Sequence, residues 1–246
     1  MGRVVGVIPA RLEATRLPRK PLRLIGDRPM IEWVYRRARQ AETLNTLLVA
    51  TDSEEISIAC GKLGIPAMMT SRACRSGTDR VVEVMGREPA DIYVNVQGDE
   101  PMVTGEHIEL MLRPFRESPE THVSTLKVAI TPDEAGNPNN VKVVTDLSGR
   151  ALYFSRAPVP FDRESSGRVQ YFKHLGLYAY SRQALERFSK LPPSDLEQYE
   201  KLEQLRFLEN GIPIHVVETS QDTIGVDSEE DLNRVEEYFR QAGDSL

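Results

Sequence analysis

The stretch Val4-Val5-Gly6-Val7-Ile8, followed by Pro9-Ala10-Arg11, decides the fold class of this chain. A continuous apolar run is typical of a strand that is buried on both faces of a parallel sheet. Apolar residues then recur at helical spacing over 30–38, and residues 47–50 form a second apolar run. Because strands that alternate with helices pair in parallel, the pattern predicts an α/β fold.

The rest of the chain extends this pattern and then changes it. Ser53 is placed as the N-cap of a helix, and a strand at 91–96 and a helix at 105–115 follow. Further strands are predicted at 123–130, 141–145, 151–154, 175–180 and 212–217, and helices at 198–209 and 228–240. We therefore expect a three-layer α/β/α sandwich with a mostly parallel central sheet and an antiparallel or mixed extension.

Composition excludes several classes of protein. The 246 residues carry a formal charge of −6, with 40% hydrophobic and 28% charged residues, as in ordinary globular proteins. An acidic chain lacks the basic surface of a general nucleic-acid binder. Two cysteines, Cys60 and Cys74, form neither a disulfide framework nor a Cys-x-x-Cys zinc knuckle. No apolar run is long enough for a membrane span or a signal peptide, so we expect a soluble cytoplasmic protein.

A basic loop follows the first strand. Between Arg11 and Arg28 there are six basic residues, against the two acids Glu13 and Asp27. Open α/β sheets bind ligands at this place, beyond the carboxyl end of a central strand, and clustered cations suit a polyphosphate. Pro18 favours a fixed loop. The loop is neither a Walker loop nor a G-x-G-x-x-G turn, and a solvated basic loop is the alternative.

Two aspartates are candidate metal ligands. Asp99 follows the strand at 91–96 directly after Gly98, and Mg²⁺ typically takes one or two carboxylates plus substrate phosphates. Asp227 precedes Ser228 and Asp231, whose spacing is that of a capping box at a helix start. Asp99 alone could be an ordinary turn residue, and the Asp227 segment an ordinary helix start. We expect both to converge with the basic loop around Mg²⁺ and a nucleotide.

Polar residues within the later apolar segments suggest a second binding surface. His174 and Tyr178 alternate onto one strand face, and Arg156 stands at a strand end, where it would pair with a carboxylate. Glu200 and Gln204 are predicted to share one helix face, with Glu203 beside them. Such a set suits a substrate with a carboxylate and many hydroxyls, although a lone histidine on a strand is more often structural.

Together these segments resemble the 3-deoxy-manno-octulosonate cytidylyltransferase family over nearly the whole chain. The segments that carry the resemblance are 8–11, 16–22, Ser76-Gly77-Thr78-Asp79-Arg80, 95–101, 151–156, Lys173-His174, 196–198, 202–206 and Gly225-Val226-Asp227. The sequence departs from the family at Phe161, where the family usually has tyrosine. The order and number of these segments make the resemblance specific.

The resemblance implies an Mg²⁺-dependent transfer of CMP from CTP to the anomeric 2-hydroxyl of 3-deoxy-D-manno-octulosonate (Kdo), with release of diphosphate, for lipopolysaccharide synthesis. It implies a Rossmann-like nucleotidyltransferase fold and a homodimer. Within one domain, 1–246, about 1–120 and 205–246 would form the nucleotide-binding core, and about 121–204 the sugar-binding and dimerisation extension.

The resemblance also implies roles for individual residues. Catalytic roles would fall to Arg11, Lys20, Asp99 and Asp227, with Mg²⁺ on the two aspartates. Nucleotide contacts would come from Pro9, Ala10, Arg11, Thr15, Arg16, Lys20, Ser76, Gly77, Asp79 and Gln97. Sugar contacts would come from Gln97, Arg156, His174, Tyr178, Glu203 and Gln204.

Other functions fit parts of the sequence. A sister enzyme would act on 8-amino-Kdo or a sialic acid with the same carboxylate clamp. A glycosyltransferase commonly uses an Asp-x-Asp motif, which does not occur here. A non-catalytic nucleotide sensor would be expected to lose its metal and phosphate residues, whereas Lys20, Asp99 and Asp227 are all present.

Overall fold

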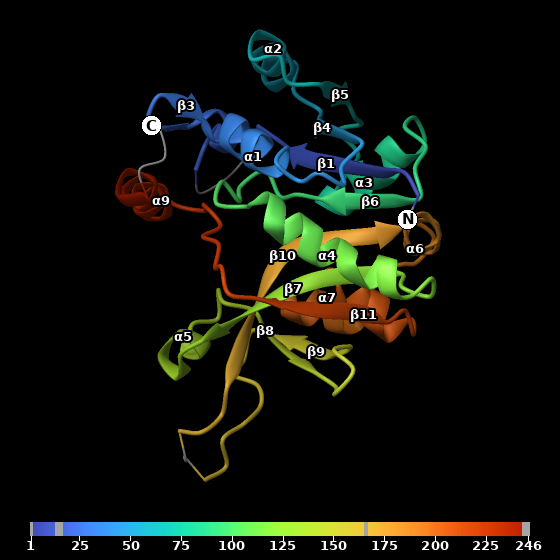
Figure 1. The fold of residues 1–246 in the computed structure, drawn as a ribbon, viewed down its shortest axis with the longest axis vertical. Coiled ribbons are helices and arrows are strands. Elements are labelled where there is room, and N and C mark those ends of the chain that lie inside the picture. Colours follow the sequence, from blue (N-terminus) through green and yellow to red (C-terminus); the bar gives the residue numbers. More distant parts are fainter. Residues whose placement is uncertain (1, 13–16, 165–166, 243–246) are drawn as a thin grey trace. The chain divides into compact units, whose positions relative to one another are not determined.

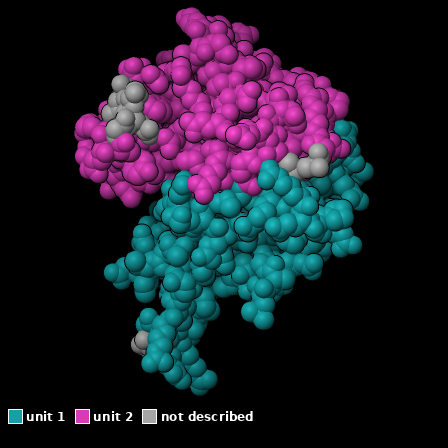
Figure 2. Space-filling model, in the orientation of Figure 1, with its two compact units in different colours: residues 1, 110–222 teal, residues 2–109, 223–246 magenta. Residues whose placement is uncertain are grey.

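The chain divides into two compact units. The computed structural model describes residues 2–12, 17–164 and 167–242. Unit 2 comprises residues 2–109 and 223–246, and unit 1 comprises residues 110–222 together with residue 1 (Figure 2). Helix α4 (Gly105–Glu117) contains the point of division.

Unit 2 is built on a parallel sheet (Figure 1). Its strands lie in the order β6 (Ile92–Asn95), β1 (Val4–Ala10), β4 (Thr46–Thr51) and β5 (Ala67–Met69), and each neighbouring pair is parallel. Val4, Val5, Val7 and Ile8 are fully buried, as the apolar run predicted. Because the strands are parallel, β1, β4 and β6 all end at one edge of the sheet.

The helices of unit 2 begin where local sequence signals place them. Helix α1 spans Met30–Ala38, and α2 (Glu54–Lys62) begins after Ser53, whose hydroxyl accepts a hydrogen bond from Ile56 N at 3.4 Å. Helix α3 (Gly77–Met85) has a full capping box formed by Ser76 and Asp79. Helix α9 spans Glu229–Ala242.

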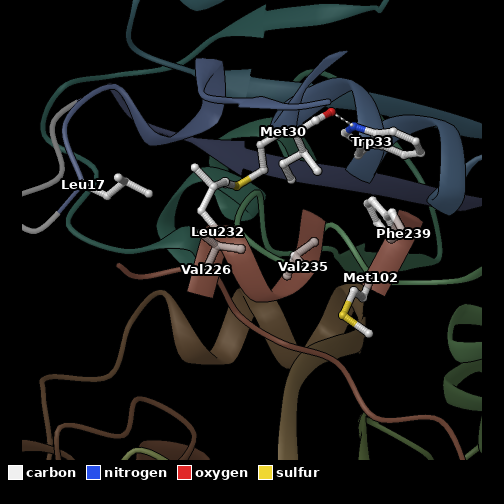
Figure 3. Packing of buried hydrophobic residues seen from close by; sticks show 9 residues of the cluster. Leu17, Met30, Trp33, Met102, Val226, Leu232, Val235 and Phe239 are labelled. Carbon is white, nitrogen blue, oxygen red and sulfur yellow. Dashed lines mark hydrogen bonds between the residues drawn. The ribbon is translucent and has the colours of Figure 1, made fainter. Parts of the chain in front are cut away.

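An apolar cluster joins distant segments of unit 2 (Figure 3). Trp33 of α1 packs on Phe239 of α9 with ring centroids 4.6 Å apart, and Trp33 Nε1 donates to the Ile25 carbonyl at 2.9 Å. The short helix η1 (Lys20–Leu22) and the hairpin β2 (Leu24–Ile25) and β3 (Arg28–Pro29) lie between β1 and α1 in sequence. Leu17 and Val226, both buried members of the cluster, flank the loops that carry Lys20 and Asp227.

Unit 1 contains the strands of the second half of the chain. Antiparallel pairs join β10 (Tyr171–Ser181) to β7 (Val123–Ile130) and to β8 (Lys142–Thr145), and β8 to β9 (Ala151–Ser155). Only β11 (Ile214–Thr219), among the described strands of this unit, pairs in parallel, with β7. The expectation of antiparallel and mixed pairing in this region is confirmed.

The helices of unit 1 are short. They are α5 (Pro132–Gly136), α6 (Arg182–Phe188), α7 (Asp195–Glu200) and α8 (Leu205–Glu209). The single helix predicted at 198–209 is wrong, because Lys201 adopts a left-handed conformation with φ 56° and ends α7. Glu203 and Gln204 therefore lie in the turn before α8, and Glu200 and Gln204 do not share a helix face.

A buried ion pair explains this break. Arg206 Nε lies 2.7 Å from Glu197 Oε2, and its guanidinium carbon stands 4.3 Å from the Phe188 ring centroid. These contacts fold α8 back towards α7 instead of continuing one straight helix. They depend on side chains nine residues apart in sequence, which a helical periodicity does not report.

The observed architecture confirms the predicted mixed α/β class with a mostly parallel sheet and helices. Within the described ranges, no helix combines the length and the apolar character needed to cross a membrane. The predicted single-domain organisation, with its functional subdivision, stays a prediction.

Two glycines of unit 2 give a paired test of this packing. A Cβ at Gly105 would lie 2.8 Å from the backbone of Gln40 and Ala41, whereas a Cβ at Gly61 would meet nothing within 4 Å. We expect Gly105→Ala to lower the free energy of unfolding by about 1–3 kcal/mol through overpacking. Gly61→Ala, inside α2, should raise it by about 0.5–1 kcal/mol. Chemical denaturation measures both, and equal shifts would contradict the described packing.

Candidate functional site

One ammonium group joins two carboxylates from opposite ends of unit 2. Lys20 Nζ lies 2.7 Å from Asp99 Oδ2 and 3.0 Å from Asp227 Oδ1. Burial lowers the pKa of the Lys20 ammonium, but the two carboxylates outweigh burial and hold this pKa above its usual value. The expected convergence of Lys20, Asp99 and Asp227 is therefore present in the structure.

Local backbone features place each of these three side chains. Arg19 adopts a left-handed conformation with φ 58°, which costs about 1 kcal/mol, and turns the chain so that η1 begins at Lys20. Gly98 lets the backbone after β6 approach β1, because a Cβ there would lie 2.6 Å from the Pro9 carbonyl oxygen. Val226 N donates to the Asp99 carbonyl at 2.9 Å, which fixes the Asp227 segment beside Asp99.

These residues border a pocket of about 370 Å³. It lies at the sheet edge where β1 and β6 end, as expected for an open α/β sheet. The predicted residues that line it are Pro9, Ala10, Arg11, Lys20, Ser76, Gly77, Gln97, Asp99 and Asp227. Ser76 and Gly77 also begin α3, and the N-terminus of a helix favours an anion.

Arg80 forms a buried part of the pocket wall. Only 4% of this residue is exposed. Its guanidinium lies 3.0 Å from Asp52 Oδ2 and donates to Thr70 Oγ1 at 2.6 Å. Asp52 follows β4 and Thr70 follows β5, so Arg80 connects α3 to the ends of two strands.

A second polar cluster lies on β10 in unit 1. His174 contacts Phe154 edge-on, with centroids 4.9 Å apart, and its ring centroid lies 5.3 Å from that of Tyr178. A bulge between Leu175 and Tyr178 compresses the strand register, and the Thr125 hydroxyl donates into it, to the Leu177 carbonyl at 2.7 Å. His174 Nε2 lies 3.0 Å from the same hydroxyl oxygen.

Some buried polar atoms of this second cluster have no hydrogen-bond partner among the described residues. Burial lowers the pKa of His174 to about 3, and burial, with Tyr180 and Glu203, raises that of Tyr178 well above its usual value. Both rings are therefore neutral near pH 7. Tyr178 OH and Gln204 Nε2 are buried and have no hydrogen-bond partner among the described residues. Buried polar atoms of this kind are expected to serve a ligand or ordered water.

Arg156, at the end of β9, is held by Glu200. Glu200 Oε2 accepts from Arg156 N at 2.9 Å, and the Glu200 carbonyl accepts from Arg156 Nε at 2.8 Å. Ser155 Oγ donates to Glu200 Oε1 at 2.7 Å. The carboxylate of Glu200 is thus engaged in positioning the segment 155–156.

Comparisons with known proteins identify the family of this chain. The sequence matches the cytidylyltransferase family over residues 5–220. It is 57% identical, over 96% of each chain, to 3-deoxy-manno-octulosonate cytidylyltransferase from Acidobacterium capsulatum. The chain belongs to the 3-deoxy-manno-octulosonate cytidylyltransferase family. The enzyme of that name from Koribacter versatilis is 54% identical over 97% of this chain and 90% of its own length.

A solved structure supports the same membership. CMP:2-keto-3-deoxy-manno-octonic acid synthetase, solved as a complex with CTP, superposes with a TM-score of 0.94 at 44% identity. The match covers 98% of this chain and 99% of that one. The predicted nucleotidyltransferase fold is confirmed.

Several residues that the family resemblance assigned to the site do not line this pocket or lie outside the described residues. Thr15 and Arg16 lie outside the described residues. Asp79 is not among the residues that line the pocket; its Oδ2 accepts from Arg75 N at 2.8 Å and Ser76 N at 3.2 Å, and so caps α3. Gln97 lines the pocket of unit 2, whereas the other predicted sugar residues belong to unit 1.

The pocket lining also includes residues that had not been assigned individually from the sequence. They are Leu17, Pro21, Cys74, Arg75, Arg80 and Gly98, of which Arg80 belongs to the segment 76–80 that the family resemblance implies for the nucleotide pocket. The spacing of Ser76 and Asp79 is that of a capping box and would have predicted α3. With α3 in place, Arg80 falls in its first turn, close to the pocket.

The buried neutral His174 predicts a pH dependence of stability. Its folded pKa of about 3 lies below the ordinary value of 6.5, so the unfolded state binds more protons between these values and stability falls as pH falls. We expect this residue to remove about 2 kcal/mol of unfolding free energy between pH 7.5 and pH 5. His174→Gln should show a correspondingly shallower loss by denaturant titration. Equal slopes in this interval would contradict a neutral buried His174, and equal slopes above pH 7.5 serve as the control.

Proposed function

We propose that this protein transfers CMP from CTP to the anomeric 2-hydroxyl of Kdo, and so forms CMP-Kdo and diphosphate. The observation that carries the proposal is the pocket at the ends of β1 and β6, where Lys20 bridges Asp99 and Asp227. A relative that matches 96% of this chain is named 3-deoxy-manno-octulosonate cytidylyltransferase, and a CMP:2-keto-3-deoxy-manno-octonic acid synthetase of the same fold was solved with CTP.

The chemistry joins two anions. The sugar oxygen forms a bond to the α-phosphorus of CTP, the bond from that phosphorus to the oxygen that bridges it to the β-phosphorus breaks, and the hydroxyl proton passes to solvent. Charge on the phosphates must be neutralised as diphosphate leaves. Arg11 and Lys20, both lining the pocket, supply positive charge, and backbone N–H groups at the start of α3 add fixed dipoles.

Asp99 and Asp227 fit a magnesium site. Asp99 Oδ2 and Asp227 Oδ1 both contact the Lys20 ammonium. The distance between these two oxygens is therefore no greater than the sum of their distances to Lys20 Nζ. The described residues include no group of three or more histidine, cysteine or acidic side chains that could hold a metal alone. A pair of carboxylates is the protein share that Mg²⁺ usually takes, with substrate phosphates completing its shell. When bound, Mg²⁺ would supply charge neutralisation and lower the pKa of a coordinated hydroxyl.

The cluster in unit 1 suits the acidic sugar. Arg156 provides a cation for a carboxylate, and Tyr178 and Gln204 provide buried polar atoms for hydroxyl groups. His174, Glu203 and Gln97 remain proposed sugar contacts. A homodimer and a cytoplasmic location remain predictions, which light scattering and cell fractionation would test.

Diphosphate release, measured with CTP and each of Kdo, 8-amino-Kdo and a sialic acid, tests the function. We expect the highest kcat/KM with Kdo; a higher value with either other sugar would overturn the choice of substrate. Lys20→Ala should lower kcat by roughly 10²–10³, because one electrostatic stabiliser of the phosphates is lost. Lys62→Ala, on α2 away from the pocket lining, is the matched control and should turn over normally.

The metal proposal predicts a specific loss of magnesium dependence. Asp99→Asn removes one of two anionic ligands, so the Mg²⁺ concentration for half-maximal activity should rise at least about ten-fold. Asp27→Asn, an exposed aspartate paired with Arg28, should leave the titration unchanged. An unaltered Mg²⁺ titration in Asp99→Asn would contradict the assignment.

A further inference from the structure

A fully buried lysine stands next to the Arg156 segment. Lys142, the first residue of β8, has no exposed surface. Its Nζ donates to the Arg156 carbonyl at 2.6 Å and to the Asn137 carbonyl at 3.1 Å. Both acceptors are neutral backbone oxygens, whereas a buried ammonium is ordinarily compensated by a carboxylate.

The two segments that Lys142 binds are the two that hold the Arg156 side chain. Arg156 Nη1 donates to the carbonyl of Pro138, the residue after Asn137, at 3.0 Å. Arg156 also donates to Glu200, through its backbone N and its Nε, as described above. In the described part of the chain, Nη2 of Arg156 donates to no protein group, which leaves it for a ligand.

The charges in this cluster are not balanced. Lys142 and Arg156 are two cations, and Glu200 is the carboxylate that acts on both. Burial, followed by the charge of Arg156, lowers the pKa of Lys142, and Glu200 only partly offsets them. An anionic ligand at Arg156 would remove the excess positive charge and stabilise the protonated lysine.

We propose that Lys142 is a positioning residue for the acidic sugar: its buried ammonium fixes the backbone of 137–138 and of Arg156, and so aims the Arg156 guanidinium at the sugar carboxylate. The inference rests on the proposed function, because it assigns Arg156 to that carboxylate. Lys142 itself does not touch the substrate. Its charge also adds to the field that favours an anion at Arg156.

Lys142→Met keeps the length of the side chain and removes the charge. We expect KM for Kdo to rise about ten-fold or more, the loss typical of one charged hydrogen bond, with KM for CTP and kcat changed less than about two-fold. Val143→Ala is the matched control, because Val143 is buried on the same strand and its truncation destabilises β8 without removing a charge. It should lower the melting temperature and leave KM for Kdo unchanged.

The outcomes separate the two proposals. A wild-type protein that fails to use Kdo overturns the proposed function. An active wild type, with an unchanged Kdo KM in Lys142→Met, overturns only the role of Lys142. A parallel rise in the KM values for Kdo and CTP, or the same Kdo effect in Val143→Ala, also overturns it, because a general loss of structure then explains the result.

The wild-type protein offers a second test that does not depend on the folding of a variant. The charged groups that act on Lys142 are Arg156 and Glu200, and its register partner on β10 is Lys173. The pKa of Lys142 lies below its usual value of 10.5 in the free protein, and a bound sugar carboxylate would raise it. Since kcat/KM reports the free enzyme and kcat the sugar-bound enzyme, kcat/KM for Kdo should fall at lower alkaline pH than kcat. Coincident profiles would overturn the proposal.

Discussion

The ion pairs of Lys20 with Asp99 and Asp227 are the constraint on which the pocket at the ends of β1 and β6 depends. Two carboxylates this close repel each other unless a cation lies between them. The three residues come from η1, the end of β6 and the segment before α9, so no local structure brings them together. Two contacts bring these residues together: Phe239 of α9 packs on Trp33 of α1, and Val226 N donates to the Asp99 carbonyl. The ion pairs of Lys20 then stabilise this arrangement.

Much of this arrangement is predictable because its signals are local. The apolar run at Val4–Ile8 indicates a buried parallel strand, and parallel strands bring their carboxyl ends to one edge. Ser228 and Asp231 form the predicted cap, with Asp231 N donating to Ser228 Oγ at 3.2 Å. The position of Asp99 and Asp227 relative to the strand and helix ends predicts their convergence with the basic loop, and the family resemblance singles out Lys20 within that loop.

The features that escaped prediction depend on contacts between distant residues. The Glu197–Arg206 ion pair and left-handed Lys201 divide a region whose composition favours one helix. The Asp79 carboxylate is the exception, because it accepts from backbone N–H groups three and four residues earlier, in a capping box that local spacing would have predicted. The bulge at Leu175–Tyr178, which brings His174 and Tyr178 closer in register, depends on Thr125 of the neighbouring strand.

The Lys20 cluster and the Lys142 cluster stabilise a cation in opposite ways. Lys20 is compensated by carboxylates and stays charged, as its raised pKa shows. Lys142 is bound by carbonyls, and its pKa is lowered. A compensated cation keeps its charge whether or not a ligand is bound. An under-compensated cation gains its full stability only when an anion binds beside it. The pocket of unit 2 and the polar cluster of unit 1 therefore follow two distinct electrostatic designs within a chain of net charge −6.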